Sequence, residues 1–300
     1  MKSVRLTLSL LASALTLTVA TASHVGASTT VPQCIVSLSP TATSTLYAIG
    51  AGANVQAVDQ DSNYPAAAAV LAKKDKINAL EPSAEGLLGL CPTSLSHPSP
   101  KPDLVIISYN PSDLAQKLEQ AGVRVLEQDA ATSVAGAEAQ IVALGRVTGH
   151  LTQAQQVVHT MQTAITTAVK SVPAHTASAV KVFYEISANP YYSATSATFV
   201  GQLLHQMGVT NIADAQDAPS DGGYPQLSKE YLVSANPSLI FLAGDATVAS
   251  VAARPGFAGL TAVKQHHVYY LDANVASQWG PRIVQLVQQM AADVTASLRK

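Results

Sequence analysis

The longest regular hydrophobic pattern in the chain lies at residues 151–172. Apolar side chains recur there every three or four residues, at Leu151, Ala154, Val158, Met161, Ile165, Ala168 and Val172. This spacing puts them on one face of an α-helix. Thr152 followed by Gln155 resembles a capping box, and Pro173 ends the pattern. A helix of about 20 residues is roughly 30 Å long, the width of a small domain. We therefore predict a connecting helix at residues 152–172.

Short apolar runs alternate with helical patterns on both sides of this helix. Strands are expected at residues 35–39, 55–58, 103–108, 123–126, 180–184, 211–213, 239–243 and 268–271. Helices are expected at 41–49, 83–90, 112–121, 133–146, 198–207, from residue 228, and at 280–298, with a loop at 187–196. Such alternation is typical of parallel sheets covered by helices on both faces. The sequence therefore predicts an α/β protein.

An internal repeat supports two lobes of similar plan. Glu85 opens a predicted helix that leads to a Pro-preceded strand, and Glu230 does the same later in the chain. A Tyr-Pro pair lies upstream of each glutamate, at residues 64–65 and 224–225. Short matches are common in chains rich in Ala and Leu, but here the order of three features repeats. We expect an N-terminal lobe at 28–151, the connecting helix at 152–172 and a C-terminal lobe at 173–300.

Residues 1–27 have the pattern of a secretory signal peptide. Lys2 and Arg5 precede an apolar segment, and the small-residue triplets ending at Ala22 and Ala27 both fit a cleavage site. A membrane anchor is the alternative, but the apolar segment is short and contains several Ser and Thr. The residues before Cys34 lack the small side chains of a lipid-attachment site. We expect a soluble mature protein that is periplasmic or secreted.

Composition excludes some classes of function. The chain has 300 residues, of which 48% are hydrophobic, so a sizeable core is available. Charged residues make up 12%, the net charge is −2, and no basic run is present. These values argue against a nucleic-acid partner.

Two cysteines, Cys34 and Cys91, remain after signal cleavage. An even pair in an oxidising compartment indicates a disulfide. Both precede predicted parallel strands, so both can lie at the same edge of one sheet. Two separate buried thiols are the alternative, and two cysteines alone make a poor metal site.

Catalytic signatures are missing from the sequence. It contains no Gly-x-Ser-x-Gly elbow, no phosphate-binding Gly-rich loop and no His-Glu-x-x-His. The eight histidines are scattered, and the adjacent His266 and His267 would point to opposite faces of a strand. We therefore expect neither an enzyme nor a resident cofactor, and a bare zinc or manganese binder is not supported.

Tyrosine is the informative aromatic residue. Five tyrosines fall in predicted loops after strands: Tyr64, Tyr109, Tyr191, Tyr192 and Tyr224. Ligands of parallel α/β sheets bind beyond the carboxyl ends of the strands. Each tyrosine by itself is as well explained by the core or the rim of a lobe. Because they occur in both halves, we predict a shared cleft that grips a bulky, partly polar ligand.

The two glutamates of the repeat have a second interpretation. The dipole of a helix favours a carboxylate in its first turn, which accounts for Glu85 and Glu230 without any function. Their matching places in the two halves suggest instead one exposed anion on each lobe, both facing a cationic partner.

Six segments carry a family resemblance, at residues 35–43, 64–65, 85–88, 101–106, 144–149 and 280–284. Together, and in this order, they resemble the periplasmic substrate-binding proteins of ABC importers for cobalamin, haem and ferric siderophores. Each is weak alone, and the resemblance covers residues 34–298. It implies two Rossmann-like lobes joined by a single long helix, with the ligand held between them and little hinge motion.

The resemblance also implies roles for the candidate residues. Glu85 and Glu230 would pair with arginines of a membrane permease dimer. Tyr64, Tyr109, Tyr191 or Tyr192, and Tyr224 fall where cobalamin-binding members carry aromatic residues around the corrin. Residues 61–65 and 280–282 are closest to that branch, so cobalamin is the expected transported ligand and a monomer the expected state.

The sequence departs from the family in two respects. Residues 91–100 form an inserted loop, and the cleft aromatics are tyrosines where cobalamin binders often carry tryptophan. A tyrosine can also ligate haem iron. Siderophore binders often meet anionic chelates with cleft arginines, for which Arg254 and Arg282 are the late candidates here. Haem or a ferric siderophore is therefore the alternative ligand, and a secreted α/β enzyme the remote one.

Overall fold

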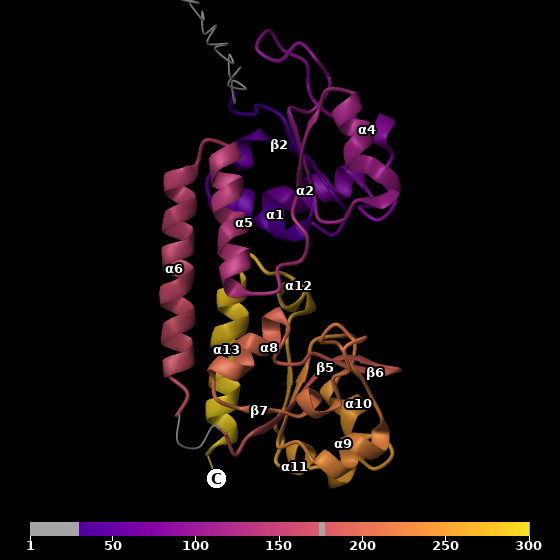
Figure 1. Cartoon of the computed structure of the whole chain (residues 1–300), viewed down its shortest axis with the longest axis vertical. Helices are drawn as coiled ribbons and strands as arrows, with labels where there is room; N and C mark the ends of the chain where they lie inside the picture. The colour runs from indigo at the N-terminus through magenta and orange to yellow at the C-terminus, as the bar shows by residue number, and fades with distance from the viewer. Residues whose placement is uncertain (1–29, 174–177, 300) are drawn as a thin grey trace, which may run out of the picture. The chain divides into compact units, whose positions relative to one another are not determined.

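The computed structural model describes residues 30–173 and 178–299, and the expected signal peptide at 1–27 lies outside these ranges. From Val31 onward the chain forms one compact unit that contains two β-sheets with their helices (Figure 1). None of the helices in the described ranges is long and apolar enough to cross a membrane.

Four parallel strands form the N-terminal sheet, in the order β2-β1-β3-β4. They are β1 (Ile35–Leu38), β2 (Val55–Val58), β3 (Leu104–Ile107) and β4 (Arg124–Glu127). Every residue of β1 and β3 is buried, because a parallel sheet is covered on both faces. The helices of this lobe are α1 (Pro40–Ala48), α2 (Ala66–Asp75), α3 (Ala84–Leu87), α4 (Leu114–Gln120) and α5 (Val134–Val147). The parallel sheet expected from the sequence is confirmed.

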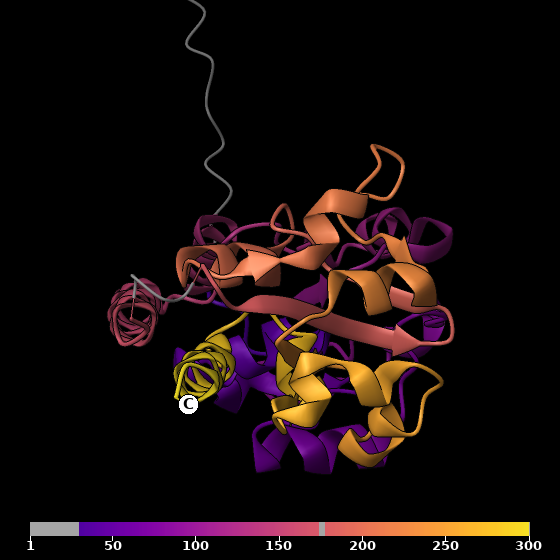
Figure 2. The same ribbon diagram turned by 90° about the horizontal axis from the view of Figure 1, so that it is seen from below.

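The long helix α6 (Leu151–Lys170) follows, close to the expected range. It buries Ala154, Met161, Ile165 and Ala168 and packs against α5 and α13 (Ile283–Ser297). Figure 2 shows α6 and α13 side by side, both nearly end-on. A Cβ at Gly145 of α5 would lie 2.4 Å from the Cβ of Ala154, so glycine is what allows α5 and α6 to approach this closely.

The predicted capping box of α6 is wrong. Its N-cap is His150, whose side chain makes no capping hydrogen bond, and Leu151 already belongs to the helix. Thr152 therefore lies inside the first turn rather than before it. A backbone hydrogen bond from His150 to the Gly145 carbonyl (2.7 Å) ties this start to the end of α5, so the turn between two helices replaces a side-chain cap.

The C-terminal sheet has the order β10-β9-β5-β6-β8, and β7 also pairs with β5. Its strands are β5 (Lys181–Ala188), β6 (Tyr191–Ser193), β7 (Thr210–Asn211), β8 (Gln226–Leu227), β9 (Leu239–Leu242) and β10 (Val268–Tyr270). The remaining helices are α8 (Phe199–Gln206), α9 (Lys229–Ala235), α10 (Val248–Ala252), α11 (Thr261–Lys264) and α12 (Ala273–Ala276). Short 3₁₀ turns are η1 (Gly52–Asn54), η2 (Pro111–Asp113), η3 (Ile212–Gln216) and η4 (Phe257–Gly259).

Two features of this sheet correct the sequence-based expectation. Strand β6 runs antiparallel to β5, and β8 runs antiparallel to β6, so this sheet is mixed rather than wholly parallel. The loop expected at 187–196 is instead a hairpin that turns at Asn189-Pro190, and Tyr191 and Tyr192 lie in its second strand. A strand this short carries too little alternation to be recognised without its pairing partner.

The predicted helices differ from those of the structure in several places, and the short helices α10, α11 and α12 were not predicted. The helix expected at 83–90 is the single turn α3, because Gly86 and Gly89 propagate a helix poorly. Helix α2 was not predicted, since its run of alanines offers little contrast between apolar and polar positions.

One buried cluster of side chains runs through both lobes. It joins residues of both sheets with residues of α6 and α13, among them Leu46, Ile106, Met161, Phe241 and Met290. Two smaller clusters cover the other face of each sheet. The two lobes therefore share a core as well as the connecting helix.

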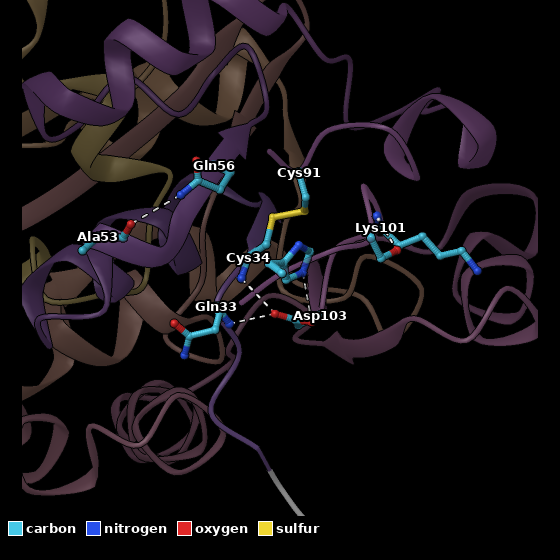
Figure 3. Close-up of a disulfide and its surroundings, with 9 residues drawn as sticks. Gln33, Cys34, Ala53, Gln56, Cys91, Lys101 and Asp103 are labelled. Atoms are coloured by element: carbon cyan, nitrogen blue, oxygen red, sulfur yellow. Dashed lines mark hydrogen bonds and ion pairs between the residues drawn. A yellow bond between two sulfur atoms is a disulfide. The ribbon is translucent and has the colours of Figure 1, made fainter. Parts of the chain in front are cut away.

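Cys34 and Cys91 form the predicted disulfide, which closes a sequence separation of 57 residues (Figure 3). The Asp103 carboxylate accepts hydrogen bonds from the backbone N–H of Cys34 (3.0 Å) and of Gln33 (2.7 Å). The other oxygen of this carboxylate lies 3.3 Å from Nε2 of His97, which belongs to the inserted loop. The disulfide and Asp103 thus hold the inserted loop against the start of β1.

Asp293 on α13 gives a testable dependence of stability on pH. Burial raises the pKa of this carboxyl from 3.8 to about 6, against the opposing effect of a hydrogen bond with Gln289. Because burial penalises the ionised form of Asp293, the contribution of this group to stability is most favourable below about pH 4, where it is neutral. That contribution is lost as pH rises through about 6 and the buried carboxyl ionises. Asp293→Asn is therefore expected to raise the free energy of unfolding by on the order of 1 kcal/mol at pH 7.5, after allowing for solvent screening.

Urea denaturation at pH 7.5 and pH 4 measures this effect. The gain should vanish at the lower pH, where the aspartic acid of the wild type is itself neutral. Glu119→Gln, which removes an exposed carboxylate on α4, serves as the control and should change neither value. An equal gain at both pH values would assign the effect to side-chain shape rather than charge.

Candidate functional site

A cavity of about 230 Å³ lies where the carboxyl ends of strands from both lobes meet. Ala130 and Ala131 reach it from the segment after β4, Tyr184 and Ile186 from β5, and Ala243 from the end of β9. The rest of its wall is Phe199, Val200, Tyr224, Ala276, Ser277, Gln278 and Trp279. No residue of the wall is charged, so the cavity is suited to an apolar or neutral group.

The aromatic wall is positioned by the C-terminal sheet and by contacts across the lobes. Tyr184 is buried on β5, and burial raises the pKa of its hydroxyl, with a smaller contribution from Tyr224, so the hydroxyl remains protonated. The Trp279 indole N–H donates to Gln140 of α5 at 2.8 Å. Ser44 of α1 lies within 3.4 Å of Gln278. The N-terminal lobe therefore fixes the segment of the C-terminal lobe that carries Trp279.

The five predicted tyrosines lie in different surroundings. Tyr224 lines the cavity and is 48% exposed. Tyr64 is also exposed, and the Arg282 guanidinium lies 4.3 Å above its ring. Tyr109, after β3, and Tyr192, on β6, are exposed as well. Of the five, Tyr224 is the one that lines this cavity, and the ligand contacts of the others stay a prediction.

Tyr191 packs on the other side of the sheet. Its ring stacks on Phe257, with the centroids 5.6 Å apart, and the Arg254 guanidinium lies 5.5 Å from each of the two ring centroids. Alternation along a strand explains the difference, because Tyr191 and Tyr192 point to opposite faces.

Sequence reasoning did not single out three aromatic residues of the cavity wall: Tyr184, Phe199 and Trp279. Tyr184 and Phe199 fell inside a predicted strand and helix, where an aromatic residue is most simply a core residue. Trp279 had a usable signal, because it directly precedes the Gly280-Pro281-Arg282 segment that carries the family resemblance.

Arg254 is held by a buried carboxylate. Its two terminal nitrogens bind the two oxygens of Glu185, one of them at 2.8 Å, and the Glu185 side chain is 1% exposed. Burial opposes the charge of Arg254, but the hydrogen bonds and charge of Glu185 outweigh it and raise the pKa of the guanidinium. Arg254 is therefore charged and already paired, and it is poorly placed to meet an anionic ligand.

Glu85 and Glu230 occupy equivalent positions in α3 and α9. In each helix a serine is the N-cap, the glutamate lies in the first turn, and a buried leucine follows two residues later. Both carboxylates are exposed, that of Glu230 at 77%, with Lys229 3.8 Å away. The repeated local structure is present in both lobes, and the role of the two glutamates in docking stays a prediction.

The described ranges contain no group of three or more His, Cys, Asp or Glu side chains that could hold a metal ion.

Comparison with known proteins identifies relatives over most of the chain. The profile of a family described as periplasmic binding protein matches residues 35–275. An ABC transporter substrate-binding lipoprotein of Bacillus subtilis is 28% identical over 270 residues, 88% of this chain and 80% of that protein. A cobalamin-binding protein of Halobacterium salinarum is 27% identical over 270 residues, 87% of this chain and 69% of that protein.

Solved structures share the fold. The periplasmic haem-binding protein HutB of Vibrio cholerae superposes with a TM-score of 0.71 at 22% sequence identity, covering 87% of this chain and 98% of that one. At this level of identity the likeness concerns the two-lobed α/β architecture, and the expected fold class is confirmed.

Proposed function

Because the chain belongs to the periplasmic binding protein family, we propose that it is the extracytoplasmic substrate-binding protein of an ABC importer and that it carries cobalamin or a related corrinoid. It acts as a monomeric carrier without enzymatic activity and delivers its ligand to a permease dimer. The working division is a signal peptide at 1–27, lobes at 28–151 and 173–300, and the connecting helix at 152–172.

The uncharged aromatic cavity carries this proposal. Tyr184, Phe199, Tyr224 and Trp279 offer ring faces and edges to a large apolar ring system, and the hydroxyls and Gln278 offer hydrogen bonds. Arg254 is already bound by Glu185, which removes one of the two late arginines from the recognition of an anionic chelate. Both observations favour a neutral ring such as a corrin, and the relative named for cobalamin agrees with this choice.

Calorimetric titration of the mature protein tests the ligand. Cyanocobalamin is expected to bind tightly and one to one, whereas haemin and a ferric hydroxamate bind weakly. Tight binding of haemin or the hydroxamate with no heat from cyanocobalamin would show that the corrinoid is the wrong ligand. The proposed role in transport would stand. If none of the three binds, the proposed ligands are all wrong and only the family assignment remains.

Tyr224→Ala is expected to weaken cyanocobalamin binding by roughly 1–3 kcal/mol, since the variant loses the ring surface that closes the cavity. Tyr224→Phe keeps the ring and serves as the matched control, with most of the affinity retained. Unchanged affinity in the alanine variant would remove Tyr224 from the ligand site. Titration calorimetry measures both variants.

A further inference from the structure

A second hollow, of about 480 Å³, adjoins the aromatic cavity along β5, and both include Ile186 in their walls. The wall of the second hollow is polar where the first is aromatic. Ser187 and Asn189 come from the β5–β6 hairpin, Asp245 follows β9, and Ser250 and Arg254 come from α10 and the turn after it. Because the two hollows share Ile186, a ligand that fills the aromatic cavity and extends past Ile186 reaches these groups.

The second hollow carries an excess of negative charge. Arg254 is neutralised by the buried Glu185, and its guanidinium packs beside the stacked rings of Tyr191 and Phe257. Asp245 is exposed, and it makes no ion pair with any residue in ranges 30–173 and 178–299. Two carboxylates against one guanidinium leave one negative charge, and Asp245 is the carboxylate that faces the hollow.

We infer that Asp245 is a specificity-determining residue, which selects ligands with carboxamides at their periphery and rejects ligands with carboxylates there. This inference rests on the proposed function and names the chemistry by which the site would separate two classes of flat macrocycle. An ionised carboxylate only accepts hydrogen bonds, so it can bind an amide N–H, whereas it repels a second carboxylate.

The aromatic cavity cannot make this distinction by itself. A corrin and a porphyrin both offer a broad apolar ring, and ring stacking discriminates poorly between them. Their edges differ, since a corrin carries amides where haem carries two propionates. Asn189 adds a neutral side-chain amide that suits ligand amides, whereas the hydroxyls of Ser187 and Ser250 donate to the backbone carbonyls of Pro190 and Thr247. The charge of Asp245 is what makes the hollow unfavourable for propionate.

Cobalamin monocarboxylic acids are the sharpest probes, because each differs from cyanocobalamin by one amide replaced with a carboxylate. We expect the wild-type protein to bind at least one of these isomers about tenfold or more weakly than cyanocobalamin, which corresponds to about 1.4 kcal/mol. In Asp245→Asn this ratio should fall to within about twofold, and affinity for haemin should rise. Asp113→Asn, which removes an exposed carboxylate of the N-terminal lobe, is the control.

The outcomes separate this inference from the proposed function. Tight binding of cyanocobalamin by the wild type, with the same isomer ratio in wild type and Asp245→Asn, would overturn the role of Asp245 and keep the corrinoid as ligand. Equal affinity of the wild type for cyanocobalamin and every acid isomer would do the same. Tight binding of haemin by the wild type would overturn both. Titrations without heat from any corrinoid or haemin would also overturn both.

Discussion

Replacing Cys34 and Cys91 together by serine is expected to lower the free energy of unfolding by about 4 kcal/mol in the chain-entropy description of a cross-link. The disulfide joins residues that are 57 positions apart, so its loss frees a long segment of the unfolded chain. That segment contains β1, β2 and α3, and the inserted loop begins at its end. Without the bridge, Asp103 has to hold the loop alone through its contacts with Gln33, Cys34 and His97. Guanidinium denaturation of the oxidised wild type and the double variant measures the difference.

The control must separate the cross-link from the change of side chain. Both cysteines are buried, so a second variant with alanine at both positions avoids burying new hydroxyl groups. Wild-type protein denatured under reducing conditions should match the alanine variant. A difference of less than about 1 kcal/mol between oxidised and reduced protein would contradict the prediction, because the native contacts alone would then hold the loop.

Replacing Glu85 and Glu230 together by alanine is expected to abolish ligand uptake while ligand affinity stays at the wild-type value. Both carboxylates are exposed at the first turns of α3 and α9, and neither belongs to the wall of the aromatic cavity. An exposed carboxylate contributes little to stability, so the fold should survive the change. An exposed carboxylate can instead attract a positively charged partner, because complementary charges raise the rate of association.

Uptake of labelled cyanocobalamin into proteoliposomes that contain the cognate permease measures this loss, and calorimetry of the same proteins measures ligand affinity. Glu119→Ala, an exposed glutamate on α4, is the matched control and should transport normally. Each single variant should retain partial uptake, since the other lobe still carries its anion. Wild-type uptake by the double variant would show that neither glutamate is needed for docking. A loss of ligand affinity would instead assign them a role in the ligand site or in the stability of the fold.

The sequence is most informative where burial follows a simple pattern. Buried parallel strands appear as short apolar runs, which is why β1, β3 and β9 were predicted within one or two residues. Helix α6 was predicted because its apolar stripe has helical spacing over its whole length. The hairpin of β5 and β6 was not, since its pairing depends on a turn and on a partner strand rather than on local pattern.

The candidate site was predicted less well for a physical reason. Tyr184 and Phe183 are neighbours in the same strand, yet one lines the cavity and the other is buried in the cluster on the opposite face. Alternation says that they point apart, but which face meets the N-terminal lobe is decided by the packing of the lobes. Tyr224 was predicted because it lies in a loop between elements, where an exposed aromatic residue has no core role to explain it.

Because of the position of Trp279, the intrinsic fluorescence of the protein reports on the aromatic cavity. The chain contains one tryptophan, and its indole lies in the wall of the aromatic cavity, bonded to Gln140 across the lobes. Emission excited beyond the absorption of tyrosine therefore comes from the site alone. A coloured ring bound there should quench this emission by energy transfer, and a colourless ligand should shift it by displacing water. Candidate ligands can thus be screened by fluorescence on unlabelled protein, with each signal arising from a known position.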